Sequence, residues 1–386
     1  MQTYDVVVYG ASGFTGRLVA EYIQATHPDL SWAMAGRSLE KLAAVRAEMG
    51  LPDSVPLLKA DVSDPTSIRD MVRRTKIVIT TVGPYLKYGE PLVAACAEAG
   101  KDYVDLCGEP PFMWNMIEKY DDVAKASGAR IVHSCGYDSI PFDLGVYMLQ
   151  EEAKSRFGAP FKDVKGRVRG MKGAYSGGTA LSGIETTKLA QSDPDVMHRL
   201  LSPFALTSGF EGARQPADHK PVYDEDLGSW AAPFYMAIIN TKNVHRSNML
   251  MGHPYGTDFT YSEMIATGPG DAGEAAARAI ASADKNAETA HLKAGDGPDK
   301  DAREAGFYDL VFTGMSDTGE RLSVNVADDR DPGYGSTCKI LTEAALCLIH
   351  DVPDATGGVL TPAPVFGHSI INRLRDNAGM VFEVES

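Results

Sequence analysis

The sequence lacks the features that mark secreted, membrane-spanning and metal-dependent proteins. Its five cysteines are odd in number and form no CxxC pair, so reduced thiols fit better than a disulfide framework. We find no signal-peptide pattern and no apolar run long enough to cross a bilayer. The histidines do not cluster with metal-ligand spacing, and P-loop, nucleophile-elbow and HExxH motifs are absent. We therefore expect a cytoplasmic protein without a catalytic metal or a transmembrane segment; peripheral contact with a membrane surface is compatible with this composition.

Basic residues are scarce as well. The chain carries 37 Lys and Arg residues against 52 Asp and Glu residues, a formal net charge of −15. Such a surface does not attract a phosphate backbone over its whole area, which argues against general nucleic-acid binding. In contrast, 44% of the residues are apolar and 23% are charged, as in ordinary globular proteins. A chain of 386 residues exceeds one core of common size, so we expect two domains.

Strand-like and helix-like segments alternate in the first part of the chain. Short runs such as Tyr4–Gly10 and Lys76–Gly83 are apolar throughout, and each is followed by a helical pattern. These units predict an α/β fold with a Rossmann-type, doubly wound parallel sheet, because a sheet with one solvated face would alternate polar and apolar residues. The six expected strands are residues 4–10, 31–36, 55–62, 76–83, 102–108 and 129–136.

The pattern changes near Phe161, where alternating segments indicate a second domain of the α+β class. The tail is helical again, and we expect it to return to the first domain. The expected parts are a Rossmann domain at 1–158, an α+β substrate and dimerisation domain at 159–332 and a C-terminal segment at 333–386 that packs back on the Rossmann domain. The sequence does not determine the oligomeric state, and a two-fold homodimer through the second domain's sheet is the default expectation.

Three glycines follow the first strand in VVVYGASGFTG: Gly10, Gly13 and Gly16. They end a strand and open a helix, where a tight turn, a close backbone approach and close helix packing are required. A pyrophosphate can then accept hydrogen bonds from the free N–H groups at the helix N-terminus. The GxxGxxG spacing is a variant of the usual GxGxxG, but the strand–turn–helix–strand context predicts a dinucleotide site. The alternative is a tight turn that binds no nucleotide.

The end of the second strand indicates which dinucleotide is bound. NAD-binding units place a carboxylate there for the ribose 2′-hydroxyl, whereas this chain has AMAGRS, with Arg37 and Ser38. A guanidinium and a hydroxyl can bind a 2′-phosphate, so NADP(H) is favoured over NAD(H). The alternative for Arg37 is a solvated surface side chain. Asp61, after the third strand, either touches the adenine amino group or caps the next helix.

Ligands of such sheets lie across the carboxyl ends of the strands. The loop after the fourth strand carries TTVGPY, and the loop after the sixth carries SCGYDSIPFD. Tyr85 and Tyr137 are the candidate proton donors, because a phenol can protonate a carbanion or oxyanion after hydride delivery. The alternative for each ring is that it only lines the pocket. Asp138 adds a carboxylate beside Tyr137.

A glycine-rich segment in the second domain, YSGGTALSG, precedes a helix. The candidate substrate-binding residues are Ser176, Gly177, Gly178 and Thr179, whose N–H groups could receive a carboxylate, thioester oxygen or phosphate. The alternative is a plain glycine-rich start of a helix.

Several motifs in order resemble the saccharopine dehydrogenase-like oxidoreductases, and among them the bacterial trans-acting enoyl reductases. The matching segments include YDVVVYGASGFTGRLVAEYI, AGRSLEKL, TVGPYLKYGEPLVAACAEAGKDYVDLCGE and CGYDSIPFDLG. The resemblance covers nearly the whole chain and implies NADP(H) as the cofactor. It implies a dinucleotide loop at Gly10, Ser12, Gly13, Phe14, Thr15 and Gly16, a phosphate clamp at Arg37 and Ser38, and ribose and nicotinamide contacts at Val82, Gly83, Pro84, Tyr85, Gly136 and Tyr137.

Three functions remain open from the sequence. The first is NADPH-dependent reduction of a C=C bond in an enoyl or lipid-like acyl substrate, for which Gly228–Asn240 is a candidate apolar pocket wall or core segment. The second is a saccharopine- or opine-type dehydrogenase acting on a C–N bond, which needs converging cations such as Arg167, Arg169 and Lys172. The third is a non-catalytic NADP(H)-binding or lipid-surface scaffold. We rank them in this order.

Overall fold

The first sheet of the protein is seven-stranded and parallel throughout. We describe it from a computed structural model, in which residues 2–289, 291–293 and 295–385 are described. The strand order is β13 (Gly358–Leu360), β6 (Arg130–Val132), β5 (Asp102–Asp105), β4 (Thr75–Thr80), β1 (Tyr4–Tyr9), β2 (Trp32–Gly36) and β3 (Leu57–Lys59). From β1 the chain adds strands first on one side, to β3, and then on the other, from β4 onward. This change of side between β1 and β4 places a crevice at their carboxyl ends, as expected for a doubly wound sheet.

Helices cover both faces of this sheet, which explains why its strands are apolar on both sides. One face packs against α1 (Phe14–Thr26), α2 (Leu39–Glu48) and α14 (Thr337–His350), and the other against α3 (Pro65–Val72), α5 (Glu90–Ala99) and α6 (Pro110–Ser127). The predicted strand and helix order is confirmed. A short helix, α4 (Tyr85–Tyr88), precedes α5 and was not expected.

The second sheet is mixed, and it is the α+β unit predicted from the alternating segments. Its order is β14 (Val381–Glu385), β12 (Arg321–Asp328), β11 (Phe307–Met315), β7 (Asp163–Lys172), β10 (Thr260–Gly268), β9 (Ser229–Pro233) and β8 (Val222–Asp224). Among the described strands of this second sheet, only β7 and β10 pair in parallel. One face packs against α7 (Ile140–Phe157), α10 (Ala237–Leu250) and α15 (Pro362–Ala378).

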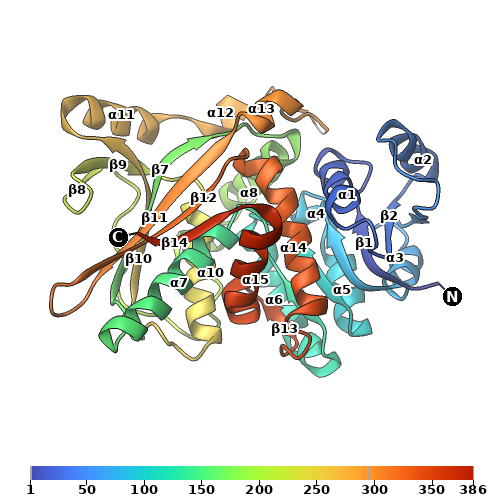
Figure 1. The fold of residues 1–386 in the computed structure, drawn as a ribbon, viewed down its shortest axis with the longest axis horizontal. Coiled ribbons are helices and arrows are strands. Elements are labelled where there is room, and N and C mark those ends of the chain that lie inside the picture. Colours follow the sequence, from blue (N-terminus) through green and yellow to red (C-terminus); the bar gives the residue numbers. More distant parts are fainter. Residues whose placement is uncertain (1, 290, 294, 386) are drawn as a thin grey trace.

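The segment after η1, a π-helical turn at Pro332–Ser336, joins the two sheets. Its helix α14 packs on the first sheet and against α1, and its strand β13 extends that sheet beside β6. The expected return to the first sheet is therefore present. The chain then continues through α15, and β14 pairs with β12 at the edge of the second sheet. Figure 1 shows α14 and α15 between the two sheets.

Figure 1 shows α8 (Gly177–Ser192), α12 (Lys285–Thr289) and α13 (Lys300–Glu304) near the junction of the two sheets. Helix α9 (Pro194–Leu201) packs against α8, while α11 (Gly270–Ser282) packs on β9 and β10. Within the described residues, no helix combines the length and apolar content that crossing a bilayer requires.

Candidate active site

The turn between β1 and α1 has the geometry that a pyrophosphate site needs. Gly10 adopts φ +91°, and a Cβ there would lie 2.8 Å from both Thr81 Oγ1 and Val82 Cγ2. A Cβ on Gly16 would overlap the Gly10 carbonyl, so helix α1 packs directly on the turn. Gly13 caps α1 without a side chain, which leaves the first N–H groups of the helix open toward a ligand.

A groove of about 800 Å³ runs from this turn along the carboxyl ends of the strands. Eleven of the predicted cofactor residues line it: Gly10, Ser12, Gly13, Phe14, Thr15, Arg37, Ser38, Asp61, Val82, Gly83 and Pro84. Three others, Gly16, Gly136 and Tyr137, line neither this groove nor the neighbouring cavity. The cofactor contacts of individual residues stay predictions, but the groove offers a glycine turn, a helix N-terminus and a cationic end to one extended ligand.

The cationic end of the groove is formed by Arg37, Ser38 and Lys41. Arg37 follows β2 and is exposed, and no hydrogen bond or ion pair of its guanidinium occurs within the described part of the chain. Ser38 caps α2, since its Oγ accepts a hydrogen bond from Lys41 N at 3.1 Å, and its hydroxyl proton stays available to an acceptor. Lys41 was not predicted. It follows Arg37 by four residues at the start of α2, and its exposed side chain lines the same end of the groove as Arg37.

Asp61 is oriented by its own turn and does not cap helix α3. Its Oδ1 accepts hydrogen bonds from Ser63 N at 3.0 Å and Ser63 Oγ at 2.8 Å, and these bonds lower the pKa of the carboxyl. The N-cap of α3 is Asp64. The capping alternative is therefore wrong for Asp61, and the residue lines the groove.

A second cavity of about 520 Å³ adjoins the groove, and Thr15, Thr81, Gly83, Ser176 and Gly178 line both. Its walls combine the strand ends of the first sheet with α8, α9 and the start of α10. Met197, Leu200, Met236, Ile238 and Ile239 contribute apolar surface, while Ser182, Thr186 and Gln191 contribute neutral polar groups. No Lys, Arg or His is among the described residues that line it. Its size is that of a pocket for a small molecule.

Helix α8 is held over this cavity by contacts at both of its faces. The Tyr334 hydroxyl accepts a hydrogen bond from Ser176 N and lies 3.0 Å from Thr179 Oγ1. Further along the helix, Ser182 Oγ donates to Glu109 Oε1 at 2.6 Å. Of the predicted substrate-binding residues, Ser176, Gly178 and Thr179 line the cavity, whereas Gly177 does not, and its N–H bonds the Asp296 carbonyl.

Glu109 links the first sheet to α8, and no sequence motif singled it out. Its carboxylate accepts hydrogen bonds from Tyr85 N at 2.9 Å and Leu86 N at 2.8 Å, in addition to Ser182. Burial raises its pKa in spite of these bonds. The buried Glu109 carboxylate thus holds the start of α4. This helix directly follows Gly83 and Pro84, which are predicted to contact the nicotinamide and its ribose.

The two tyrosines predicted as proton donors occupy different places. Tyr85 lines the cavity, but its hydroxyl donates to the Thr80 carbonyl at 3.2 Å and accepts from Leu106 N at 3.4 Å. Tyr137 lies outside both the groove and the cavity, with its hydroxyl 3.3 Å from Met171 Sδ. Burial raises the pKa of both phenols well above the usual range.

Asp138 is the carboxylate beside Tyr137, and it does line the cavity. Its side chain is partly exposed there, and removal from water raises its pKa to about 7. Across the described residues, the structure gives this carboxyl no hydrogen bond and no ion pair.

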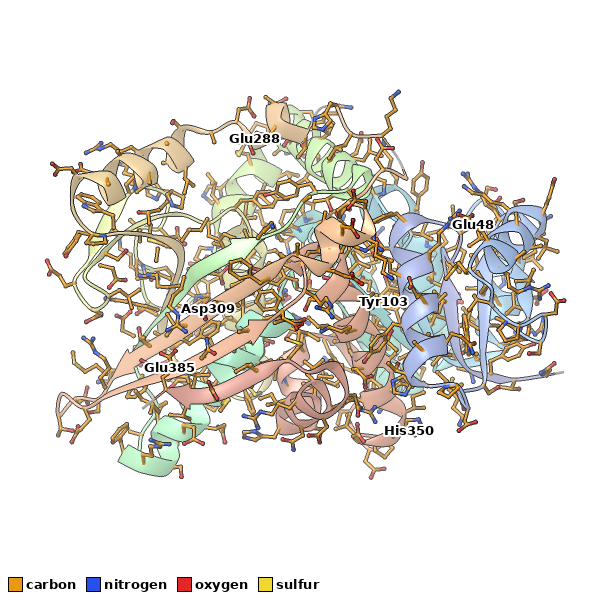
Figure 2. The ribbon with its side chains drawn as sticks, turned by 45° about the horizontal axis from the view of Figure 1, so that its top comes forward. Glu48, Tyr103, Glu288, Asp309, His350 and Glu385 are labelled. Atoms are coloured by element: carbon orange, nitrogen blue, oxygen red, sulfur yellow. The ribbon has the colours of Figure 1, made fainter. Side chains whose placement is uncertain are left out.

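The cations that a C–N dehydrogenase would need lie elsewhere. Arg167 is buried and bonded to Asp224 Oδ2 at 2.8 Å, and Arg169 pairs with Asp309 Oδ1 at 2.8 Å and Glu385 Oε1 at 2.6 Å. Figure 2 labels Asp309 and Glu385 on the strands of the second sheet. Neither arginine lines the cavity, and neither does Lys172.

The parallel sheet carries a dinucleotide groove at its strand ends, a mixed sheet follows it, and a cavity adjoins the groove. This arrangement defines a two-domain pyridine-nucleotide oxidoreductase. Residues 6–132 match the family model described as the saccharopine dehydrogenase NADP binding domain. A Mycobacterium tuberculosis protein, provisionally named a trans-acting enoyl reductase, is 40% identical across 96% of this chain and 95% of its own length. The trans-acting enoyl reductase of Mycobacterium bovis is 36% identical across 98% of this chain and 97% of its own.

The chain belongs to the saccharopine dehydrogenase-like family, in the group of the trans-acting enoyl reductases. It is an NADP-dependent oxidoreductase, and NADP(H) is its cofactor, as the groove's cationic end predicts. The apo saccharopine dehydrogenase of Saccharomyces cerevisiae has the same fold, with a TM-score of 0.56 over 99% of both chains at 12% identity. The resemblance and the fold class inferred from the sequence are confirmed.

Proposed function

We propose that the protein reduces a C=C bond conjugated to the carbonyl of an acyl substrate, with NADPH as the hydride source. The observation that carries this proposal is the cavity beside the predicted nicotinamide end of the groove, whose described wall is mainly apolar and contains no basic side chain. An acyl chain gains free energy by leaving water for such walls, at roughly 25 cal/mol per Å² of buried apolar area. The relatives named trans-acting enoyl reductases support the same class of substrate.

The C–N dehydrogenase alternative has no comparable support. Its substrate carries several carboxylates, and burying a carboxylate without a partner cation is costly. The described cavity wall supplies no basic side chain, and Arg167 and Arg169 are already paired with carboxylates of the second sheet. The scaffold alternative predicts binding of NADPH without turnover, so it is an outcome of the experiment below.

The residues of the chain have three tasks in this reaction. The groove from Arg37 to Pro84 orients the dinucleotide, which supplies a hydride when bound. The walls formed by α8, α9 and α10 exclude water and position the acyl chain. A proton donor must complete the reduction, since hydride addition alone leaves an enolate.

The test is NADPH oxidation by the purified protein with enoyl-thioesters of increasing acyl length, beside pairs of an amino acid with a 2-oxoacid or aldehyde. We expect turnover with the thioesters and a KM that falls as the chain lengthens, since each added methylene buries further apolar area. Turnover confined to the amine pairs would overturn the proposal. Tight NADPH binding without turnover on either panel would favour the scaffold instead.

A matched pair of variants locates the acyl site. Ile238 lines the cavity and is 41% exposed, so Ile238→Asp places a charge at its mouth without burying it in the core. We expect its KM for the longer thioesters to rise about tenfold, with an unchanged NADPH Kd. Leu201→Asp is the control, because Leu201 is 73% exposed and does not line the cavity. Equal effects of the two variants would argue against this site.

A further inference from the structure

The loop after β6 brings one ionisable side chain to the cavity with no internal partner. Asp138 lines the cavity, and the described residues offer its carboxyl no hydrogen bond or ion pair. A Cβ placed on Gly108 would lie 3.5 Å from Asp138 Oδ2 and 3.9 Å from Met236 Cε, so the glycine leaves open space beside the carboxyl. A carboxyl that lies on a cavity wall, is partly removed from water and has no protein partner among the described residues calls for a functional explanation.

The backbone beside this carboxyl is strained. Ser139 adopts φ +149° and ψ −34°, a region that side chains other than glycine rarely occupy and that costs on the order of 1–3 kcal/mol. Its N–H bonds the Tyr137 carbonyl at 2.8 Å, which closes a tight turn with Asp138 at the centre. The turn directs the carboxyl to the cavity while helix α7 begins immediately after it.

Buried side chains from a second element maintain that turn. Ser139 Oγ donates to Asn240 Oδ1 at 3.0 Å and accepts from Asn243 Nδ2 at 2.6 Å. Asn240 in turn donates to Glu263 Oε1 on β10 at 2.6 Å. Three buried polar residues on α10 and β10 therefore hold a strained turn in place, as expected where a conformation is required by function.

We propose that Asp138 is the proton donor of this reductase, which delivers a proton to the α-carbon of the substrate. The proposal rests on the proposed function. In that reaction the hydride adds to the β-carbon, and the C=C electron pair moves onto the α-carbon and carbonyl oxygen as an enolate. The Asp138 O–H bond breaks, its proton forms the new C–H bond at the α-carbon, and the carboxylate regains a proton from solvent. NADPH is oxidised to NADP⁺, and the acyl substrate gains two hydrogens.

The surroundings of Asp138 favour its protonated form near neutral pH. The titratable groups that face it are Cys107 after β5, Tyr137 on the same loop, Tyr175 before α8, Tyr235 before α10 and Tyr334 in η1. The pKa values of all five are raised, mainly because these groups are largely removed from water, so they stay neutral where an aspartate titrates. Loss of water around the carboxyl is the one cause that raises the pKa of Asp138 to about 7.

The experiment compares wild type with Asp138→Asn and Asp138→Glu on an enoyl-thioester that the wild type reduces. We expect kcat of Asp138→Asn to fall by about 10²–10⁴-fold with an unchanged NADPH Kd, and Asp138→Glu to recover part of the rate. In wild type, kcat falls as pH rises through about 7, and Asp138→Asn loses this dependence. In D₂O the Asn variant is expected to deuterate both faces of the α-carbon, because solvent then replaces the positioned donor.

A matched control separates a chemical role from a structural one. Asp143 follows on α7, and burial raises its pKa to about 7 as well, but it accepts hydrogen bonds from Ser247 Oγ and Ala363 N and does not line the cavity. Asp143→Asn is expected to keep the wild-type pH profile and a single face of deuteration. Without substrate, ¹³C NMR of labelled aspartate is expected to show two carboxyls that titrate near pH 7, one of which disappears in Asp138→Asn and the other in Asp143→Asn.

Each result is decisive. The wild type could reduce the thioester while Asp138→Asn keeps the wild-type rate and pH profile. That result would overturn the donor assignment and leave the proposed function intact. Loss of rate in Tyr85→Phe together with a fully active Asp138→Asn would move the donor role to the phenol. A wild type that reduces no enoyl-thioester overturns the proposed function, and the donor assignment with it.

Discussion

The nucleotide groove and the proposed substrate cavity share a wall, yet they are built in different ways. The predicted part of the groove comes from successive turns within residues 9–88, and cations such as Arg37 and Lys41 mark one end. The cavity is assembled from strand ends, α8, α9, the start of α10 and Tyr334, which are far apart in the sequence, and its described wall contains no cation.

The difference reflects the two ligands. A dinucleotide carries fixed charges, and a glycine turn at a helix N-terminus can meet them with local backbone geometry. The acyl chain that we propose as substrate offers few polar groups, so its site would depend on surfaces that only tertiary packing brings together. Variants that act on one region and spare the other therefore test this division.

The largest effect on nucleotide binding is expected in the groove. Gly10→Ala forces a side chain into φ +91° and against Thr81 and Val82, each 2.8 Å from the new Cβ. Strain of about 3 kcal/mol corresponds to a loss of roughly 150-fold in NADPH affinity, measured by fluorescence titration. Gly50→Ala is the control, since Gly50 has φ +65° with no atom within 4 Å of its Cβ. Equal losses in both variants would contradict a specific role for the turn.

On the cavity side, stability is expected to depend on pH through Glu263. Burial raises its pKa from 4.5 to about 8, and Asn240 and the Tyr261 hydroxyl bond it. Since the folded state binds this proton more tightly than the unfolded state, its contribution is full below about pH 4.5 and is lost as pH rises through 8. The free energy of unfolding in urea should fall on the order of 3–4 kcal/mol between pH 5 and 8.

Glu263→Gln should flatten that dependence without changing NADPH affinity. Part of the slope will remain, because burial also raises the pKa of Asp143 to about 7. A slope identical to wild type would show that Glu263 is ionised in the folded protein.

A smaller effect is expected at the cationic end of the groove. Arg37→Ala removes charge-assisted hydrogen bonds to the 2′-phosphate, worth about 2–3 kcal/mol, so NADPH Kd should rise about 30- to 150-fold. NADH affinity should not change, since NADH lacks that phosphate. Arg73→Ala, an exposed arginine whose only ion pair in the described chain is with Asp70 at 3.5 Å, is the control. Parallel losses for both nucleotides would refute the clamp.

The smallest effect is expected where α8 meets the first sheet. Ser182→Ala removes one hydrogen bond to the Glu109 carboxylate, at 2.6 Å, and should cost about 1 kcal/mol. We expect substrate KM to rise about fivefold with little change in kcat or NADPH Kd. Ser192→Ala, at the far end of α8, removes only a bond to the Leu189 carbonyl and should match wild type in steady-state kinetics.

Much of the first sheet and its glycine turn could be predicted because the signals are local. Each strand is apolar on both faces, and Gly10, Arg37 and Ser38 stand at fixed distances from strand ends. The cavity could not be predicted in the same way. The Tyr85 hydroxyl is hydrogen-bonded to Thr80 and Leu106, whereas the described part of the structure gives the Asp138 carboxyl no such bond. Only the folded chain reveals this difference. Glu109 had no motif, and its role arises from Ser182, 73 residues away.

The strands that follow residue 357 bear on how the protein is made. β13 forms one edge of the first sheet beside β6, β14 forms one edge of the second beside β12, and each follows its partner in the chain. Until residues 358–385 are synthesised, β6 and β12 are the edge strands, and unpaired edges can pair with other chains. A chain truncated before residue 358 would therefore expose other edges than the full chain does.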